Sequence, residues 1–272
     1  MKYIVCKVGV PVRKIWWVVL LLVLLTSLGA CGGKGASADT IRDKGTLRVG
    51  VKMDVPEFGY LNPSTGEVEG LEIDLARLIA QDILGDSQAL EMVSVTAQTR
   101  EPMLENGEVD IIIATFTITE ERMKRFHFIG PYYRDEIGFL VRDDSGLSRV
   151  ADMDGKVIGI VNSGTAYGAL VAEAELRGIE MSYREFASYP ELNAALLASE
   201  VDAFSVDKSI LNGYKSEGTH IIDEGFNTQE YGIAVMKNSS ELAKYLDKLM
   251  KDIQKDGRLE EILTRWGHEM PE

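Results

Sequence analysis

The chain can be interpreted outward from Ala114-Thr-Phe-Thr-Ile-Thr-Glu-Glu-Arg122, which follows the apolar run Val109-Asp-Ile-Ile-Ile113. The apolar run predicts a buried strand that ends in hydroxyl side chains, after which a threonine starts a helix with Arg122 in its first turn. Free backbone N–H groups, the positive end of a helix dipole and a guanidinium fork would then converge. Such a combination suits a carboxylate, so this stretch is predicted to bind one end of a small anionic molecule.

Strands and helices are expected to alternate on the N-terminal side of this stretch. Leu47–Met53 places apolar residues at every second position, which predicts a first strand that ends near Lys52. The next elements are expected to be a loop at 54–60, a turn at 62–66, a helix over 71–83 closed by Gly85, a strand at 91–95, a loop with a short helix at 98–107 and a buried parallel strand at 108–114. This alternation is typical of the α/β fold class, whose ligands bind beyond the carboxyl ends of the strands.

A second α/β body is predicted to begin with a strand at 137–141. It continues with a strand at 156–161, a turn at 162–165, a helix over 166–177 closed by Gly178, a helix over 190–199 and a strand at 200–206. The sequence Leu104-Glu-Asn-Gly-Glu-Val-Asp-Ile-Ile-Ile113 is echoed by Leu197-Ala-Ser-Glu-Val-Asp-Ala-Phe204. Either one helix-to-strand unit is used twice, or so short an echo is a coincidence.

The two copies of this unit lead into different polar side chains. The first leads into Thr115 and Thr117, and the second leads into Ser205 and Asp207. If both strand ends face one cleft, one wall offers hydroxyl groups and Arg122, and the other offers a hydroxyl and a carboxylate. A zwitterion would fit between two such walls.

The C-terminal part is predicted to return to the first body. A strand is expected at 230–236, an amphipathic helix at 241–255 and a last short helix at 258–266. The first body would comprise residues 41–132 and 232–272, and the second would comprise 137–227. Two chain crossings, near 132–136 and 227–231, would form a hinge.

The composition excludes some classes of partner and site. The chain has 272 residues, 45% of them apolar, and a formal net charge of −14. Such a charge argues against nucleic acid, because duplex binding depends on Lys and Arg that neutralise phosphates. The two cysteines, Cys6 and Cys31, lie near the N-terminus, so neither a disulfide framework nor a four-cysteine zinc site is expected. No metal and no cofactor is expected.

Residues 1–30 are predicted to be a signal peptide, because four basic residues precede the apolar run Ile15–Leu25, which is short for a bilayer span. Leu28-Gly-Ala-Cys31 resembles a bacterial lipobox, in which cleavage leaves Cys31 as a lipidated N-terminus. Residues 31–40 would then be a flexible tether. An uncleaved membrane anchor is the alternative. In either case the body is expected to be extracytoplasmic and held at the cell membrane.

The order and spacing of several motifs resemble those of the polar amino-acid-binding proteins of bacterial ABC importers. The resemblance covers nearly all of residues 41–268. It is carried by Leu47–Asp54, Gly70-Leu-Glu-Ile-Asp-Leu-Ala76, Ala114–Arg122, Phe128-Ile-Gly-Pro-Tyr-Tyr133, Val201-Asp-Ala-Phe-Ser-Val-Asp207, Gln229-Glu-Tyr-Gly232 and Lys255-Asp-Gly-Arg258.

This resemblance implies two α/β lobes that close on one amino acid and deliver it to an ABC permease with its ATPase subunits. Arg122, with Thr117 beside it, would take the α-carboxylate, and Asp207 would take the α-ammonium. The turn at Ser163–Ala166, including Thr165 and Ala166, would offer further N–H groups to the carboxylate. A monomer is expected.

Within the family, the sequence looks most similar to the aspartate/glutamate-binding branch. That likeness implies that Lys52 and Arg100 face the ligand side chain. Three cations against Asp207 would suit a ligand with two carboxylates and one ammonium, because unpaired buried charge is costly. The alternatives are that Arg100 is a solvated loop residue and Lys52 an exposed strand end. Phe58 could cover the methylene groups of the ligand or simply pack, and Tyr231 could belong to the hinge, the site or both.

Other functions remain as alternatives. The ligand could be glutamine or another polar amino acid. Among enzymes, the nearest alternative is a periplasmic dehydratase built on the same two-lobe fold. However, His127, His220 and His268 are scattered and have no cysteine partner or metal-ligand spacing, so an enzyme is not expected.

Overall fold

The computed structural model describes residues 35–270, and the chain from Gly35 onward forms one compact unit. The predicted signal peptide, the lipidated Cys31 and the first residues of the predicted tether lie outside the described residues. Within residues 35–270, the helices are all too short or too polar to cross a membrane.

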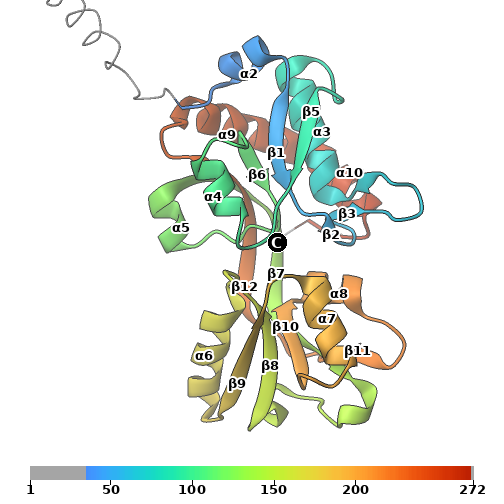
Figure 1. Cartoon of the computed structure of the whole chain (residues 1–272). Coiled ribbons are helices and arrows are strands. Elements are labelled where there is room, and N and C mark those ends of the chain that lie inside the picture. The colour runs from blue at the N-terminus through green and yellow to red at the C-terminus, as the bar shows by residue number, and fades with distance from the viewer. Residues whose placement is uncertain (1–34, 271–272) are drawn as a thin grey trace, which may run out of the picture. The chain divides into compact units, whose positions relative to one another are not determined.

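A nine-stranded mixed sheet runs through this unit (Figure 1). Its order is β5 (Leu90–Ser94), β1 (Leu47–Val51), β6 (Ile111–Ile113), β12 (Phe226–Met236), β7 (Phe126–Arg142), β10 (Ala203–Asp207), β8 (Lys156–Val161) and β9 (Met181–Phe186), with β11 (Thr219–Ile221) paired to β7. The strands β5, β1 and β6 are parallel to one another, and so are β10, β8 and β9. The two central strands, β12 and β7, pair antiparallel.

Helices flank the parallel strands at both ends of this path (Figure 1). Lobe 1 comprises β5, β1, β6 and the adjacent halves of β7 and β12, with α2 (Ala38–Lys44), α3 (Leu71–Leu84), α4 (Arg100–Glu105), α5 (Glu120–Arg125), α9 (Ser240–Lys255) and α10 (Arg258–Arg265). Lobe 2 comprises β10, β8, β9, β11 and the other halves of β7 and β12, with α6 (Ala166–Arg177), α7 (Tyr189–Leu197), α8 (Lys208–Tyr214) and the 3-10 turns Asp143–Ser145 and Val150–Met153. The predicted α/β fold class is confirmed.

The burial of these elements follows the sequence patterns. All three residues of β6 are fully buried, as expected for a parallel strand covered on both faces. Helix α9 buries one stripe at helical spacing, which packs it against the sheet. The residues of this stripe are Leu242, Leu246, Leu249, Met250 and Ile253.

The internal echo corresponds to a repeated structure. Asp110 donates its N–H to the carbonyl of Arg48 and accepts the N–H of Arg48 at Oδ2, at 2.8 and 3.0 Å. Asp202 does the same with Val157, at 2.8 Å for both bonds. Each Asp therefore fixes the start of its strand against the neighbouring parallel strand. Gly107 and Ser199, three residues earlier, both adopt a left-handed backbone, with φ of 70° and 60°.

The strands β7 and β12 carry the chain between the lobes, and their pairing matches Thr228 with Glu136, Gln229 with Asp135, Glu230 with Arg134 and Tyr231 with Tyr133. The predicted crossings, 132–136 and 227–231, lie within this ladder. The lobe boundaries predicted from the sequence stay a prediction.

Several local expectations were wrong. The part of the predicted tether between 35 and 40 is fixed, because Ser37 caps α2 and the N–H of Ala36 donates to Ser239 Oγ at 2.9 Å. The loop at 54–60 contains part of a small antiparallel sheet, formed by β2 (Asp54–Val55), β3 (Gly59–Leu61) and β4 (Val68–Glu69). The elements α2, β9, α8 and β11 were not anticipated.

Candidate functional site

The carboxyl ends of β6 and β10 meet at a small cavity of about 20 Å³ between the lobes. Seven of the residues predicted for the site line it together, namely Arg100, Thr115, Thr117, Thr165, Ala166, Ser205 and Asp207. Val161, Gly164, Tyr189 and Val206 complete the lining. The two predicted walls therefore face each other across one space.

On the lobe 1 wall, Thr115 leaves β6 in a left-handed conformation with φ of 43°. This conformation costs a non-glycine residue of the order of 1 kcal/mol, so the surrounding contacts must hold it. Its N–H donates to Glu72 Oε1 at 2.6 Å, and Arg100 Nη1 donates to the carbonyls of Ala114 and Thr115 at 2.8 and 3.1 Å. Thr117 then forms a bridge with Tyr231 of β12. Contacts with α3, α4 and β12 thus hold the segment that follows β6.

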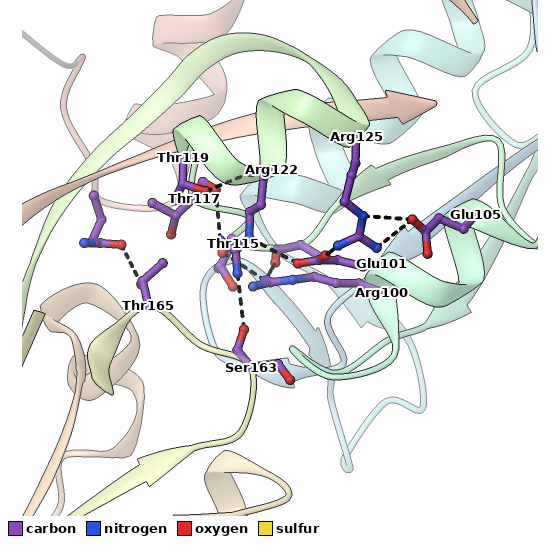
Figure 2. Close-up of polar contacts among 12 residues, drawn as sticks. Arg100, Glu101, Glu105, Thr115, Thr117, Thr119, Arg122, Arg125, Ser163 and Thr165 are labelled. Atoms are coloured by element: carbon purple, nitrogen blue, oxygen red, sulfur yellow. Dashed lines mark hydrogen bonds and ion pairs between the residues drawn. The ribbon is translucent and has the colours of Figure 1, made fainter. Parts of the chain in front are cut away.

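Arg122 projects from α5 toward the lobe 2 turn (Figure 2). Its Nη1 donates to the carbonyl of Thr117 at 2.9 Å, its Nη2 donates to the carbonyl of Ser163 at 3.2 Å, and its Nε lies 3.2 Å from Glu101 Oε1. The guanidinium carbon also lies 4.6 Å from the centre of the Phe116 ring. Burial lowers the pKa of Arg122 to about 10, so the side chain stays cationic at neutral pH.

The helix start contributes less than the sequence suggested. Thr119 caps α5 by accepting the N–H of Arg122 at Oγ1, at 3.2 Å, so this N–H is not free for a ligand. The helix has only six residues. On this wall, the group suited to a carboxylate is therefore the guanidinium. Arg122 is not part of the cavity lining; it lines a groove of about 570 Å³ beside the cavity, together with Thr117, Ser163 and Thr165.

On the lobe 2 wall, Asp207 ends β10 and is 4% exposed. Burial, and secondarily the charge of Asp135, raises the pKa of Asp207 to about 7. The hydroxyl of Tyr231 donates to Asp207 Oδ2. The two neighbouring hydroxyls are already engaged, since Ser205 Oγ donates to the carbonyl of Gly138 at 2.8 Å and Thr165 Oγ1 donates to Gln229 Oε1 at 2.7 Å.

Lys52 and Arg100 are both buried, at 2% and 3% exposure, so the alternatives of an exposed strand end and a solvated loop residue are wrong. Arg100 lines the cavity. Lys52 is not part of the lining; its Nζ lies 2.9 Å from Asp54 Oδ1 and 4.8 Å from the centre of the Tyr189 ring. Burial lowers the pKa of Lys52, although the charge of Asp54 opposes this effect.

Two aromatic candidates differ in position. Phe58 lies outside the lining of the cavity and packs against Tyr133 and His268, with its ring centre 5.0 Å from each of theirs. Tyr231 is fully buried in β12, lies outside the lining of the cavity and donates to Asp207, so it joins the β7–β12 ladder to a lining residue; its roles in a hinge and in ligand binding stay predictions.

Sequence analysis missed four acidic or aromatic residues in and around the site. Three of them lie at helix starts, namely Glu72, Glu101 and Tyr189, and the fourth, Asp135, lies in β7. Glu72 sits in a predicted helix start, where an acidic residue is ordinary, and a buried partner cannot be foreseen from one sequence. Asp135 follows Tyr133 within an extended run, and only the pairing of the strands places it beside Tyr231.

The ionised groups around the cavity are already partly paired. Glu101 lies against both Arg122 and Arg125 (Figure 2), and Asp54 lies against Lys52. Arg100 has no carboxylate in direct contact among the salt bridges of residues 35–270. In the same part of the chain, no group of three or more His, Cys, Asp or Glu side chains is arranged to bind a metal ion.

The sequence of residues 47–269 matches the family of bacterial extracellular solute-binding proteins, family 3. The chain belongs to this family. It is 37% identical to the ABC transporter glutamine-binding protein GlnH of Bacillus subtilis over 90% of this chain and 93% of that protein. It is 30% identical to the glutamate-binding protein GluB of Corynebacterium glutamicum over 89% of this chain and 85% of that protein.

The fold of this family member is also similar to that of solved structures. An ancestral arginine-binding protein bound to glutamine superposes with a TM-score of 0.73 at 31% identity, over 82% of this chain and 97% of that chain. The resemblance to amino-acid-binding proteins of ABC importers is therefore confirmed. The relatives are binding proteins, which supports the expectation that the chain is not an enzyme.

Proposed function

We propose that this protein captures a polar α-amino acid for an ABC importer and that its preferred ligand is L-glutamine. L-Glutamate is the second candidate. The pairing of Lys52 with Asp54 carries this choice, because it neutralises a cation that the sequence assigned to an acidic ligand side chain.

The backbone groups of an amino acid fit the two walls. Arg122 is the partner for the α-carboxylate, since the hydrogen bonds of its fork go to two carbonyl oxygens and Glu101, and a carboxylate is a stronger acceptor than a carbonyl. Asp207 is the partner for the α-ammonium. The hydroxyl of Thr117 and the N–H groups of the turn at 163–166 lie beside these charges and supply further hydrogen bonds.

The charge balance favours a neutral side chain. Lys52, Arg100, Arg122 and the ligand ammonium are cationic, while Asp54, Glu101, Asp207 and the ligand α-carboxylate are anionic. Glutamine adds no charge to this set, whereas glutamate adds a buried anion, which is costly unless Arg100 compensates it. Arg100 is the group that would donate to the side-chain carbonyl oxygen, which both ligands have. The similarity to GluB and the cationic Arg100 keep glutamate as the second candidate.

Binding requires the lobes to separate and close. A cavity of about 20 Å³ has room for about one water molecule, which is far less than an amino acid needs. The β7–β12 ladder is the proposed hinge, and the groove beside Arg122 is the proposed entrance. Four or five charge-assisted hydrogen bonds, each worth roughly 1.5–3 kcal/mol, sum to roughly 6–15 kcal/mol, and the upper part of this range covers both the roughly 8 kcal/mol that micromolar affinity requires and the cost of closure.

Calorimetry on the chain without residues 1–31, which keeps the whole compact unit, tests this proposal with glutamine, glutamate, aspartate and arginine. Glutamine should bind most tightly, and Asp207→Asn should weaken every interaction at least tenfold. Tighter binding of glutamate or aspartate would restore the acidic assignment. Tightest binding of arginine, or no binding at all, would refute the proposal.

The membrane attachment is proposed separately. Cleavage before Cys31 and lipidation of its thiol would hold the protein outside the cytoplasm beside its permease. Mass spectrometry of the mature N-terminus should show a diacylglyceryl-modified Cys31, and Cys31→Ala should release the protein from the membrane fraction. An unmodified Cys31 within an intact leader would support the uncleaved anchor instead. Size-exclusion chromatography with light scattering should give a monomer.

A further inference from the structure

Two carboxylates converge on a single hydroxyl at the junction of the lobes. Tyr231 of β12 donates its O–H to Asp207 Oδ2. The hydroxyl oxygen of Tyr231 also lies 3.4 Å from Asp135 Oδ2. Asp207 lies at the end of β10 and Asp135 lies in β7, so one residue from each of three strands meets here. Tyr231 is fully buried, and Asp207 is almost so.

A hydroxyl has one proton, so Tyr231 can donate to only one of these carboxylates. While it donates to Asp207, its contact with Asp135 is favourable only if Asp135 carries a proton and donates it. The remaining partners of Asp135 are the backbone N–H groups of Glu136 and Ser209, at 2.8 and 3.0 Å. Within residues 35–270 no salt bridge involves Asp135. The hydrogen-bond geometry therefore fits one proton held by the pair.

The electrostatics of the site agree with this geometry. Burial raises the pKa of both carboxyls, and the charge of Asp135 contributes to the shift at Asp207. Two adjacent buried carboxyls titrate as a pair, and the first proton leaves more readily than the second. The free protein therefore retains a shared proton at mildly acidic pH.

We infer that Asp135 is a positioning residue of the ammonium subsite, acting through Tyr231, and that binding of an ammonium ligand expels the proton shared by Asp135 and Asp207. This inference rests on the proposed function, since it takes Asp207 as the partner of the ligand ammonium. The ligand keeps its own protons. The only bond broken is the O–H bond of the shared carboxyl, and its proton passes to the buffer.

Asp135 offers the proton a route into a pocket other than the ligand cavity. Asp207 lines the ligand cavity, whereas Asp135 lines a separate pocket of about 550 Å³ together with Tyr133, Lys208 and Ser209. The hydroxyl of Tyr231 thus connects two compartments. A proton can leave through Asp135 after the ligand has filled the cavity.

Other charged or titratable groups near the pair act in known directions. Arg100 and Arg122 favour the ionised form of Asp207, as the ligand ammonium would. Burial raises the pKa of Tyr133 and Tyr189, so both stay neutral, and burial lowers the pKa of His268, which lines the Asp135 pocket. Charged side chains around that pocket pair with each other, as Arg134 with Glu230 and Lys208 with Glu136.

The sign of the pH dependence follows. Binding lowers the pKa of the pair from its raised value in the free protein, so affinity is highest above that value and falls as the pH drops through it. With a pKa of about 7 for Asp207, the dissociation constant should rise about 30-fold between pH 8 and pH 5.5.

The test is calorimetry at pH 6 in two buffers of different ionisation enthalpy, with the amino acid that binds most tightly in the panel above. The wild-type protein should release close to one proton per ligand. Asp135→Asn should release less than half as much, and its affinity should fall less as the pH drops. Glu136→Gln, which removes a neighbouring carboxylate that points to Lys208, should behave like the wild type.

Heats that do not depend on the buffer, or equal proton release in Asp135→Asn and the wild type, would overturn the inference. The wild-type measurement stands even if Asp135→Asn fails to fold. Failure of the proposed function is distinct, since it would appear as no binding of any amino acid or as unchanged affinity in Asp207→Asn.

Discussion

Replacing Glu72 by glutamine should remove a pH-dependent cost from the stability of the protein. Glu72 is fully buried, its Oε1 accepts the N–H of Thr115 and the hydroxyl of Tyr132, and its Oε2 has no partner. Burial raises the pKa of Glu72 from 4.5 to about 7, against the hydrogen bonds and the charges of Lys52 and Arg100. Glutamine keeps an acceptor oxygen at the same place and cannot ionise.

The magnitude follows from proton linkage. Between pH 4.5 and pH 7 the folded state binds the proton more tightly than the unfolded state, so the free energy of unfolding falls as the pH rises. The fall is about 1.4 kcal/mol per pH unit within this window. Between pH 5 and pH 8 the wild type should lose about 2.5 kcal/mol that Glu72→Gln does not lose. Comparing the two pH values cancels any pH-independent packing cost of the substitution.

Urea unfolding at pH 5 and pH 8, followed by circular dichroism and by the fluorescence of Trp266, measures this difference. Glu67→Gln, the same substitution at an exposed position, serves as the control. The reasoning is refuted if the stability difference between Glu72→Gln and the wild type is the same at both pH values. That result would mean that Glu72 stays ionised in the fold and that Lys52 and Arg100 compensate it.

Three further substitutions test the site. Arg122→Lys keeps the charge but loses the fork, so calorimetry should show about 100-fold weaker binding of every amino acid; unchanged affinity would contradict its role as carboxylate partner. Asp54→Asn leaves Lys52 unpaired, so the preference should move toward glutamate by about tenfold; an unchanged ratio of glutamine to glutamate affinity would remove Lys52 from the selectivity argument. Thr119→Ala removes the cap of α5 and should lower the free energy of unfolding by about 1 kcal/mol in urea titrations, and no loss would show that the cap is dispensable.

Much of the fold could be predicted because the periodic signals are strong. The alternation in Leu47–Val51, the apolar run at Ile111–Ile113 and the stripe of α9 each specify an element and its buried face. The small sheet formed by β2, β3 and β4 could not be predicted, because Pro56 and Gly59 also fit an irregular loop. The helix α2 was missed because Ser37 and Ala38 fit a tether as well as a helix start.

The site was predictable where the residues follow directly from strand ends. Thr115, Thr117, Ser205 and Asp207 line the cavity because the parallel strands of each lobe point their carboxyl ends toward the other lobe. Charge pairing was not predictable, because it depends on side-chain contacts between separate elements. Lys52 and Asp54 are two residues apart, and only the fold decides whether they face each other or opposite sides of the chain.

The paired aspartates Asp110 and Asp202 bear on how such a protein can change its ligand. Each lobe fixes the start of the strand that leads into its part of the site with the same backbone contact, and neither contact involves the other lobe. Recombination between related genes at the β7 and β12 crossings would therefore exchange an intact half-site. New specificities could arise by combining a carboxylate-binding half from one ancestor with an ammonium-binding half from another.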